Sequence, residues 1–133
     1  MTNKKRCGDV AELQVASHLT KEGWQVLFPY GEYCRYDIVA EKHGRFIKVQ
    51  VKYVTPKNGT LTINCKSSNN WSVKPYTKEE IDCIVAYDSL SEEIYFIDVK
   101  DIKKSELRLR LGPTRNNQKV GVRLADDYKN IPF

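Results

Sequence analysis

Four polar residues in the first half of the chain have the types and the order that suit metal-dependent hydrolysis of a phosphodiester. Glu12 lies in a stretch with helical periodicity, and Asp37 opens a short apolar run. Gln50 and Lys52 lie near the end of a second apolar run. Carboxylate and amide oxygens are ligands that Mg²⁺ accepts, and a lysine beside them can orient water and stabilise charge on a phosphoryl group. This chemistry requires that local structure bring the four side chains together.

The spacing around Asp37 predicts a β-hairpin. Residues 37–41 and 46–54 both have strand character, and the polar residues 42–45 form a short turn between them. Alternate residues of a strand share a face, so Gln50 and Lys52 are expected to project together. Antiparallel pairing brings the start of the first strand beside the end of the second. Asp37 is therefore expected to lie next to Gln50 and Lys52.

Glu12 is the fourth member of the group and is predicted to lie on a helix over residues 9–22. The apolar stripe of this helix consists of Ala11, Val15, Ala16 and Leu19. Glu12 falls inside that stripe, and an inward carboxylate needs a partner or a metal to offset its desolvation. A divalent cation between Glu12 and Asp37 would supply one. The alternative is a capping box, in which Asp9 and Glu12 satisfy the helix N-terminus.

The remaining pattern predicts an α/β domain with one central mixed β-sheet flanked by helices. Further strands are expected at 24–29, 60–65, 84–87 and 94–99, and the Asn58-Gly59 turn predicts that 46–54 and 60–65 form a second hairpin. Residues 66–72 are expected to form a polar loop, and a short helix is expected to start near Thr77. A chain of 133 residues fits a single domain, with a core at about 8–100 and a basic extension at about 101–133.

Composition limits where the protein works and what it binds. No apolar stretch approaches the roughly 20 residues of a membrane span, and the N-terminus lacks the apolar run of a secretory signal. A cytoplasmic protein without membrane contact is therefore expected. The four cysteines are irregularly spaced, which favours free thiols over structural zinc. The net charge is +5, and residues 103–123 are strongly basic, which suits a polyanion such as nucleic acid or, more simply, a solvated face.

Segments 8–12, 23–26, 36–39 and 46–52 together resemble the PD-(D/E)XK nuclease superfamily. Within it, the chain is most similar to the bacterial group I intron-associated homing endonucleases. The resemblance covers residues 8–54 well and residues 81–99 more loosely. It implies a restriction-endonuclease-like core and a Mg²⁺-dependent DNA endonuclease, with Mn²⁺ able to substitute.

The resemblance also implies roles for the four polar residues and for one neighbour. Asp37 would be the central metal ligand, and Gln50 would provide a neutral oxygen where an acidic residue is more usual. The backbone carbonyl of Val51 would be another ligand. Lys52 would orient or help deprotonate the attacking water. Glu12 would hold a second metal, a coordinated water or Lys52, and the sequence does not choose among these.

Candidate DNA contacts fall in three parts of the sequence. Arg35 and Tyr36 directly precede Asp37 and are expected to touch phosphate beside the scissile bond. The second hairpin and the loop after it are long enough to enter a major groove, with Lys57, Asn58, Thr62, Asn64, Lys66, Asn69, Asn70, Trp71 and Lys74 as contacts. The basic extension adds phosphate contacts at Arg108, Arg110, Arg115, Asn116, Asn117, Lys119 and Arg123.

Other functions remain open from the sequence alone. A structure-selective enzyme such as a Holliday-junction resolvase has similar core motifs. A catalytically silent DNA-binding module of the same fold is a second alternative because of Gln50. A third is a protein-interaction domain that uses an acidic face, since residues 76–98 contain seven acidic residues against one lysine. Because one active site cuts one strand, double-strand cleavage predicts a homodimer or homotetramer.

Overall fold

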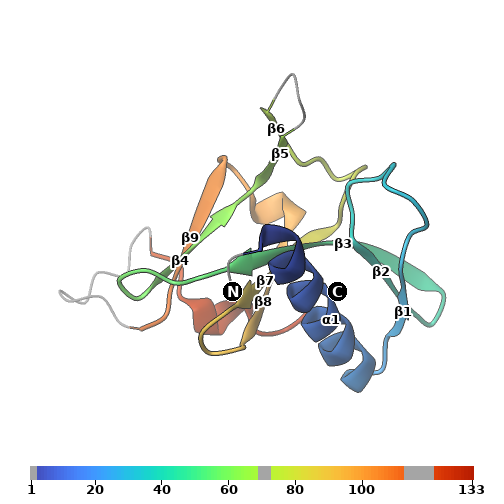
Figure 1. The fold of residues 1–133 in the computed structure, drawn as a ribbon, viewed down its shortest axis with the longest axis horizontal. Coiled ribbons are helices and arrows are strands. Elements are labelled where there is room, and N and C mark those ends of the chain that lie inside the picture. Colours follow the sequence, from blue (N-terminus) through green and yellow to red (C-terminus); the bar gives the residue numbers. More distant parts are fainter. Residues whose placement is uncertain (1–2, 69–72, 113–121) are drawn as a thin grey trace.

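A mixed sheet of five strands forms the centre of the protein in this computed structural model, which describes residues 3–68, 73–112 and 122–133. The strand order is β1-β2-β3-β7-β8 (Figure 1). The strands are β1 (Gln25–Leu27), β2 (Ile38–Lys42), β3 (Arg45–Val54), β7 (Cys83–Asp88) and β8 (Ile94–Asp98). β3 and β7 are parallel, whereas the other neighbouring strands are antiparallel. The predicted α/β class with a central mixed sheet is confirmed.

Helix α1 (Lys4–Lys21) begins five residues earlier than predicted, because Asn3 caps it. The Asn3 side chain accepts a hydrogen bond of 3.1 Å from the Arg6 N–H. The helix ends at Lys21 with Glu22 as its C-cap, and the next residue, Gly23, has a φ of 92°, in the left-handed region that glycine tolerates. Asp9 is therefore inside the helix and forms an ion pair with Lys5 at 2.9 Å. The capping-box explanation of Glu12 is wrong, since the N-cap is Asn3 and Glu12 lies about two and a half turns beyond it.

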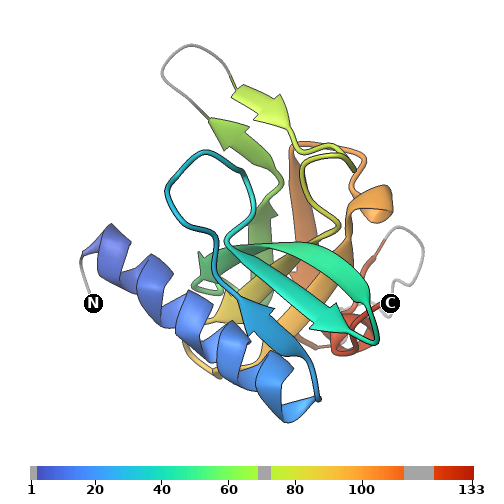
Figure 2. The ribbon, with the colours of Figure 1, turned by 90° about the vertical axis from the view of Figure 1, so that its right-hand side faces the viewer.

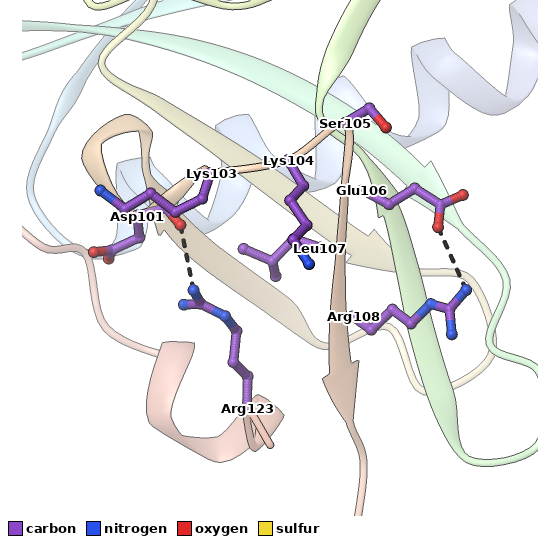
Figure 3. A pocket seen from close by; sticks show the side chains of 8 residues that line it. All are labelled: Asp101, Lys103, Lys104, Ser105, Glu106, Leu107, Arg108 and Arg123. Carbon is purple, nitrogen blue, oxygen red and sulfur yellow. Dashed lines mark hydrogen bonds and ion pairs between the residues drawn. The ribbon is translucent and has the colours of Figure 1, made fainter. Parts of the chain in front are cut away.

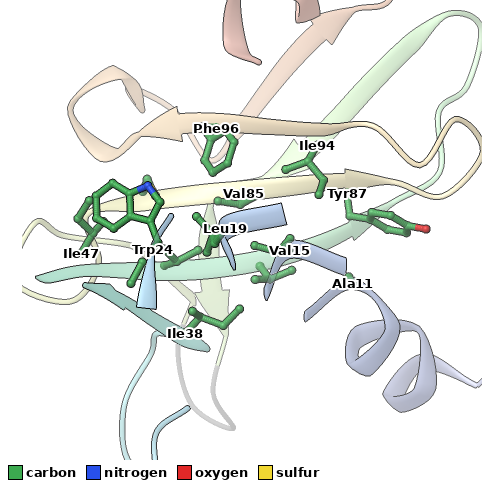
Figure 4. Packing of buried hydrophobic residues seen from close by; sticks show 14 residues of the cluster. Ala11, Val15, Leu19, Trp24, Ile38, Ile47, Val85, Tyr87, Ile94 and Phe96 are labelled. Atoms are coloured by element: carbon green, nitrogen blue, oxygen red, sulfur yellow. The ribbon is translucent and has the colours of Figure 1, made fainter. Parts of the chain in front are cut away.

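The helix packs on one face of the central sheet (Figure 2). Ala11, Val15 and Leu19 of α1 are fully buried there. They contact the inward residues of the strands, which include Ile38, Ile47, Val85 and Phe96 (Figure 4). Since α1 contacts β1, β2, β3 and β7, its position on the sheet is fixed, and so are the positions of its polar residues.

A second core lies on the opposite face, beneath a two-stranded antiparallel sheet of β4 (Thr60–Asn64) and β9 (Glu106–Arg110). The Asn58-Gly59 turn forms as predicted, with φ of 52° and 73° and paired hydrogen bonds between Lys57 and Thr60. The predicted hairpin of 46–54 with 60–65 is nevertheless wrong, because β4 pairs with β9. The alternating apolar residues of β4 are buried on the second core, so the strand lies over the face of the central sheet instead of pairing with β3.

Two smaller predictions also need correction. Residues 66–72 were expected to be a loop, but β5 (Lys66–Ser68) pairs with β6 (Val73–Pro75), and this small sheet projects from the domain (Figure 1). No helix starts at Thr77: its N–H and hydroxyl both donate to the Glu80 carboxylate at 3.1 Å, and the chain then enters the buried strand β7. The 3₁₀ helices η1 (Val99–Asp101) and η2 (Ala125–Tyr128) complete the described elements.

Among the described residues, no helix has both the length and the apolar character needed to cross a membrane. Cys7, Cys34, Cys65 and Cys83 are free thiols.

Candidate active site

The hairpin of β2 and β3 positions Asp37. Its turn at His43 and Gly44 has φ of 53° and 80°, the left-handed pair typical of a two-residue hairpin turn. This turn sets a register in which Ile38 pairs with Val49. The Asp37 N–H donates to the Val49 carbonyl at 2.8 Å, and Asp37 Oδ2 accepts from the Val51 N–H at 2.9 Å. Asp37 is therefore fixed to β3 by both its backbone and its carboxylate.

The same register directs the backbone carbonyl of Val51 toward Asp37. In an antiparallel ladder the N–H and C=O of one residue point to the same neighbouring strand. The Val51 N–H points to the Asp37 carboxylate, beyond the first residue of β2. Its carbonyl therefore points to that side as well, past the end of β2, where no β2 residue pairs with it.

Gln50 and Lys52 lie on the other face of β3 from the helix. Ile47, Val49 and Val51 are buried against α1, and the half-buried residues between them face away from it. Lys48 shares that face but is anchored elsewhere, since its ammonium donates to the Glu79 carbonyl. The structure thus brings Asp37, Gln50 and Lys52 to one end of the β2–β3 pair, as the sequence predicted.

Glu12 lies on α1 near Asp37, and it is half-buried. Burial is the main cause that raises the pKa of Glu12, and the charges of Asp37 and Asp9 raise it further. Lys5 acts in the opposite direction. Two partly buried carboxylates that repel each other are unfavourable without a cation. A divalent ion bound between them would offset both the repulsion and the loss of hydration.

Asp37 and Lys52 form the next pair of interacting charges. Burial raises the pKa of Asp37, while the Val51 N–H and the Lys52 ammonium lower it. Burial also disfavours the charged form of Lys52, so it lowers the pKa of this lysine, and the charge of Asp37 opposes that effect. Asp37 therefore interacts with both Glu12 and Lys52.

Tyr76 is a site residue that the sequence did not reveal. It is buried, its hydroxyl is 3.4 Å from Lys52 Nζ, and Nζ lies 5.4 Å from the centre of its ring. Both contacts favour the charged form of lysine. Cys65 is also near, but burial raises the pKa of its thiol to about 11, so it remains neutral beside Lys52.

Arg35 and Tyr36, the two residues before Asp37, have structural contacts of their own. Arg35 Nε forms an ion pair of 2.6 Å with Glu80 Oε2, and Tyr36 packs against the second core. Glu80 in turn accepts from Thr77 through its other oxygen. Glu80 thereby ties the segment before Asp37 to the segment after Tyr76, and it holds both sides of the site.

The donor set fits a hard divalent cation. Within the described residues no three His, Cys, Asp or Glu side chains cluster as metal ligands. The available oxygens come instead from two carboxylates, Glu12 and Asp37, together with the Gln50 amide and the Val51 carbonyl. Asp37 uses Oδ2 for Val51, so Oδ1 is the oxygen that remains for a cation. Two negative charges with neutral oxygens suit Mg²⁺, which keeps several waters.

The predicted DNA contacts are spread over several elements. Lys57 and Asn58 are exposed at the turn before β4, and Asn64 and Arg108 are exposed on β4 and β9. Lys66 and Lys74 belong to the strands β5 and β6, and Arg110 ends β9. Asn69, Asn70, Trp71, Arg115, Asn116, Asn117 and Lys119 lie outside the described residues.

Comparisons with known proteins give a family and a structural relative. Residues 2–131 match the family described as PD-(D/E)XK endonuclease. The structure is similar to that of a bacterial homing endonuclease, I-Ssp6803I, with a TM-score of 0.78, 27% sequence identity and coverage of 96% of this chain and 88% of that one. A weaker likeness, with a TM-score of 0.48, 14% identity and coverage of 77% and 83%, is to Archaeoglobus fulgidus Hjc, a Holliday junction resolvase from an archaeal hyperthermophile. No curated protein matches the sequence.

Proposed function

Because this chain belongs to the PD-(D/E)XK endonuclease family, we propose that it is a Mg²⁺-dependent endonuclease that cuts duplex DNA at specific sequences. One observation carries the proposal: the Asp37 carboxylate is fixed to β3 and interacts electrostatically with both Glu12 and Lys52. Similarity over 96% of the chain to a bacterial homing endonuclease supports the site-specific form of the activity. A double-strand cut needs two such sites, so the proposal includes a homodimer or homotetramer.

Glu12, Asp37, Gln50 and the Val51 carbonyl would hold the metal in this proposal. Bound there, Mg²⁺ would supply Lewis-acid stabilisation of the phosphoryl oxygens and a more acidic water, and Mn²⁺ is expected to substitute. The charged groups that act on Glu12 are Asp37, Asp9 and Lys5, and Lys52 is not among them. This favours a metal role for Glu12 over the alternative of holding Lys52.

Lys52 would act as an ammonium group at the scissile phosphate. Its interaction with Asp37 and its two contacts with Tyr76 favour the protonated form, even though burial opposes it. An ammonium in a partly dry site orients the attacking water and stabilises charge that develops on the phosphoryl oxygens. Tyr76 would then be a positioning residue that acts through Lys52.

Cleavage of pooled DNA tests the proposed substrate class. Linear duplexes of mixed sequence and immobile four-way junctions are incubated with the protein and Mg²⁺, and the new ends are sequenced. We expect cuts that recur at one duplex sequence. Cuts confined to junctions would replace the proposal with a structure-selective resolvase, and binding without any cuts would replace it with a silent DNA-binding module.

The acid limb of the pH–rate profile should lie above the ordinary carboxylate range near pH 4. Glu12 and Asp37 must be ionised to hold a cation, and the pKa of each is raised, mainly by burial. Cleavage should therefore fall as the pH drops through these raised pKa values. Protons and Mg²⁺ compete for the same carboxylates, so a higher Mg²⁺ concentration should move this limb to lower pH. Profiles at two Mg²⁺ concentrations with the same acid limb would contradict this.

Replacing Tyr76 with phenylalanine should slow cleavage about tenfold, which corresponds to one hydrogen bond to a charged group. The ring and its burial are kept, but the hydroxyl that accepts from Lys52 is lost. The pKa of Lys52 should fall further, so the alkaline limb of the pH–rate profile should move to lower pH. Tyr95→Phe is the control, because Tyr95 is buried in the same core cluster without a place in the site. An unmoved alkaline limb in Tyr76→Phe would remove Tyr76 from the proposal.

A further inference from the structure

The two-stranded sheet of β4 and β9 has a sharply divided inner and outer side. Leu61, Ile63, Leu107 and Leu109 point inward and are buried on the second core. The alternate residues form the outer side, which we call the ribbon face. It consists of Thr60, Thr62 and Asn64 from β4 and Glu106, Arg108 and Arg110 from β9. Because the inner residues are fixed in the core, the ribbon face is a rigid platform.

The ribbon face carries groups that form hydrogen bonds with base edges. Thr62 pairs with Arg108 across the two strands, and Asn64 pairs with Glu106. Arg108 and Glu106 are in an ion pair of 3.5 Å, but their side chains are 71% and 53% exposed, so little free energy holds Arg108 in that position. Arginine and asparagine are the side chains that most often read guanine and adenine in the major groove.

Three adjoining hollows connect the ribbon face with Lys52. The first, of about 450 Å³, is lined by Lys52 and by residues of β3 and β4. It shares Lys57, Thr60 and Thr62 with a second hollow of about 460 Å³. That hollow shares Arg108 and Arg123 with a third of about 620 Å³, at the start of β9 (Figure 3). A continuous concave path thus leads from the candidate active site over the ribbon face.

The charge along this path suits a polyanion. Beyond Lys52, its basic lining residues are Lys57, Lys103, Lys104, Arg108, Arg110 and Arg123, against the acids Asp101 and Glu106. Arg123 is held in place by hydrogen bonds to the Tyr128 hydroxyl and the Asp101 carbonyl. The ribbon face itself has no aromatic side chain on which an unpaired base could stack, which favours a duplex over a single strand.

We infer that the β4–β9 ribbon face enters the major groove of duplex DNA beside the scissile phosphate and reads its base sequence, with Arg108 as the principal base contact. A major groove admits a two-stranded ribbon of this kind. Lys103 and Lys104, at the far end of the path, contact phosphates. The inference takes its substrate, duplex DNA, from the proposed function. It adds the element of the protein that recognises the DNA sequence.

Selection from a randomised duplex pool tests the inference separately from catalysis. Binding is measured with Ca²⁺ in place of Mg²⁺, and the bound sequences are read for the wild-type protein and for Arg108→Ala, Arg108→Gln and Lys103→Ala. The Arg108 variants should lose roughly 5- to 150-fold discrimination at one or two base pairs. Lys103→Ala should weaken binding equally for all sequences and reduce the salt slope by about 1. Lys21→Ala, an exposed charge at the end of α1, is the control and should change neither.

Unchanged base preference in both Arg108 variants, or a wild-type protein with no base preference, would overturn the inference. Arg108 is exposed, so both variants are expected to fold. If Arg108→Ala does not fold, Arg108→Gln, which keeps a long polar side chain, still tests the inference. Cleavage with Mg²⁺ is scored separately. If the wild-type protein and Arg108→Ala cut at the same single site, the proposed nuclease function would stand and the role of the ribbon face would be wrong. If Arg108→Ala changes the base preference but the wild-type protein does not cut DNA, the role of the ribbon face would stand and the nuclease function would be wrong.

Discussion

The Asp37→Asn variant is expected to cleave DNA about a thousandfold more slowly than the wild-type protein. Asp37 is proposed as the central metal ligand, and metal stabilisation of a phosphoryl group contributes several kcal/mol to the transition state, at about 1.4 kcal/mol for each tenfold in rate. Asparagine keeps the oxygen that accepts from the Val51 N–H, so the local structure should be retained. The rate and the half-saturating Mg²⁺ concentration are measured together, and the latter should rise.

Thermal unfolding in EDTA separates this effect from misfolding. The pKa of Asp37 is raised in the folded protein, so its ionised form costs stability at pH values above that pKa. Removing the charge should leave the unfolding temperature at neutral pH unchanged or higher. An Asp37→Asn protein that is equally stable and cleaves at the wild-type rate would exclude Asp37 from metal binding.

The Lys52→Ala variant should lose about a hundred- to a thousandfold in cleavage rate while still binding DNA. The loss corresponds to one electrostatic group aimed at the charge that develops in the transition state. A second effect follows from the pair with Asp37. Without the ammonium, the pKa of Asp37 should rise further, and the acid limb of the pH–rate profile should move to higher pH.

Lys48→Ala is the matched control for Lys52. Lys48 lies on the same strand and the same face, but its ammonium is bound to the Glu79 carbonyl. Single-turnover cleavage and filter binding are compared for both variants. Equal losses in the two variants would show that lysine charge on this face acts through DNA binding alone, and the proposed role of Lys52 would then be wrong.

Strand periodicity and one turn were sufficient to predict the centre of the site. A two-residue alternation places Gln50 and Lys52 on one face, and the short turn at His43 and Gly44 fixes which residue lies opposite Asp37. These are interactions between neighbours in the sequence, so local rules determine them. The inward position of Glu12 follows in the same way from the helical period, although the helix starts at Lys4 and Glu12 is half-buried.

Long-range packing determines what the sequence did not predict. The pairing of β4 with β9 joins residues that are 42 to 50 positions apart in the sequence, such as Thr62 and Arg108. The Asn58-Gly59 turn gave no sign of this pairing. Tyr76 comes close to Lys52 only because the chain of β5 and β6 returns to the sheet. Polar residues 66–72 carry no periodic pattern that indicates this return. An aromatic residue beside a predicted site lysine is visible only in the folded structure.

DNA cleavage over a Mg²⁺ titration tests the central claim most directly, with wild-type protein and Asp37→Asn measured side by side on a pooled duplex substrate. The account predicts no cleavage in EDTA, saturable cleavage by the wild-type protein as Mg²⁺ rises, and a rate about a thousandfold lower in the variant. Wild-type cleavage that persists in EDTA, or equal rates for the two proteins at every Mg²⁺ concentration, would contradict it.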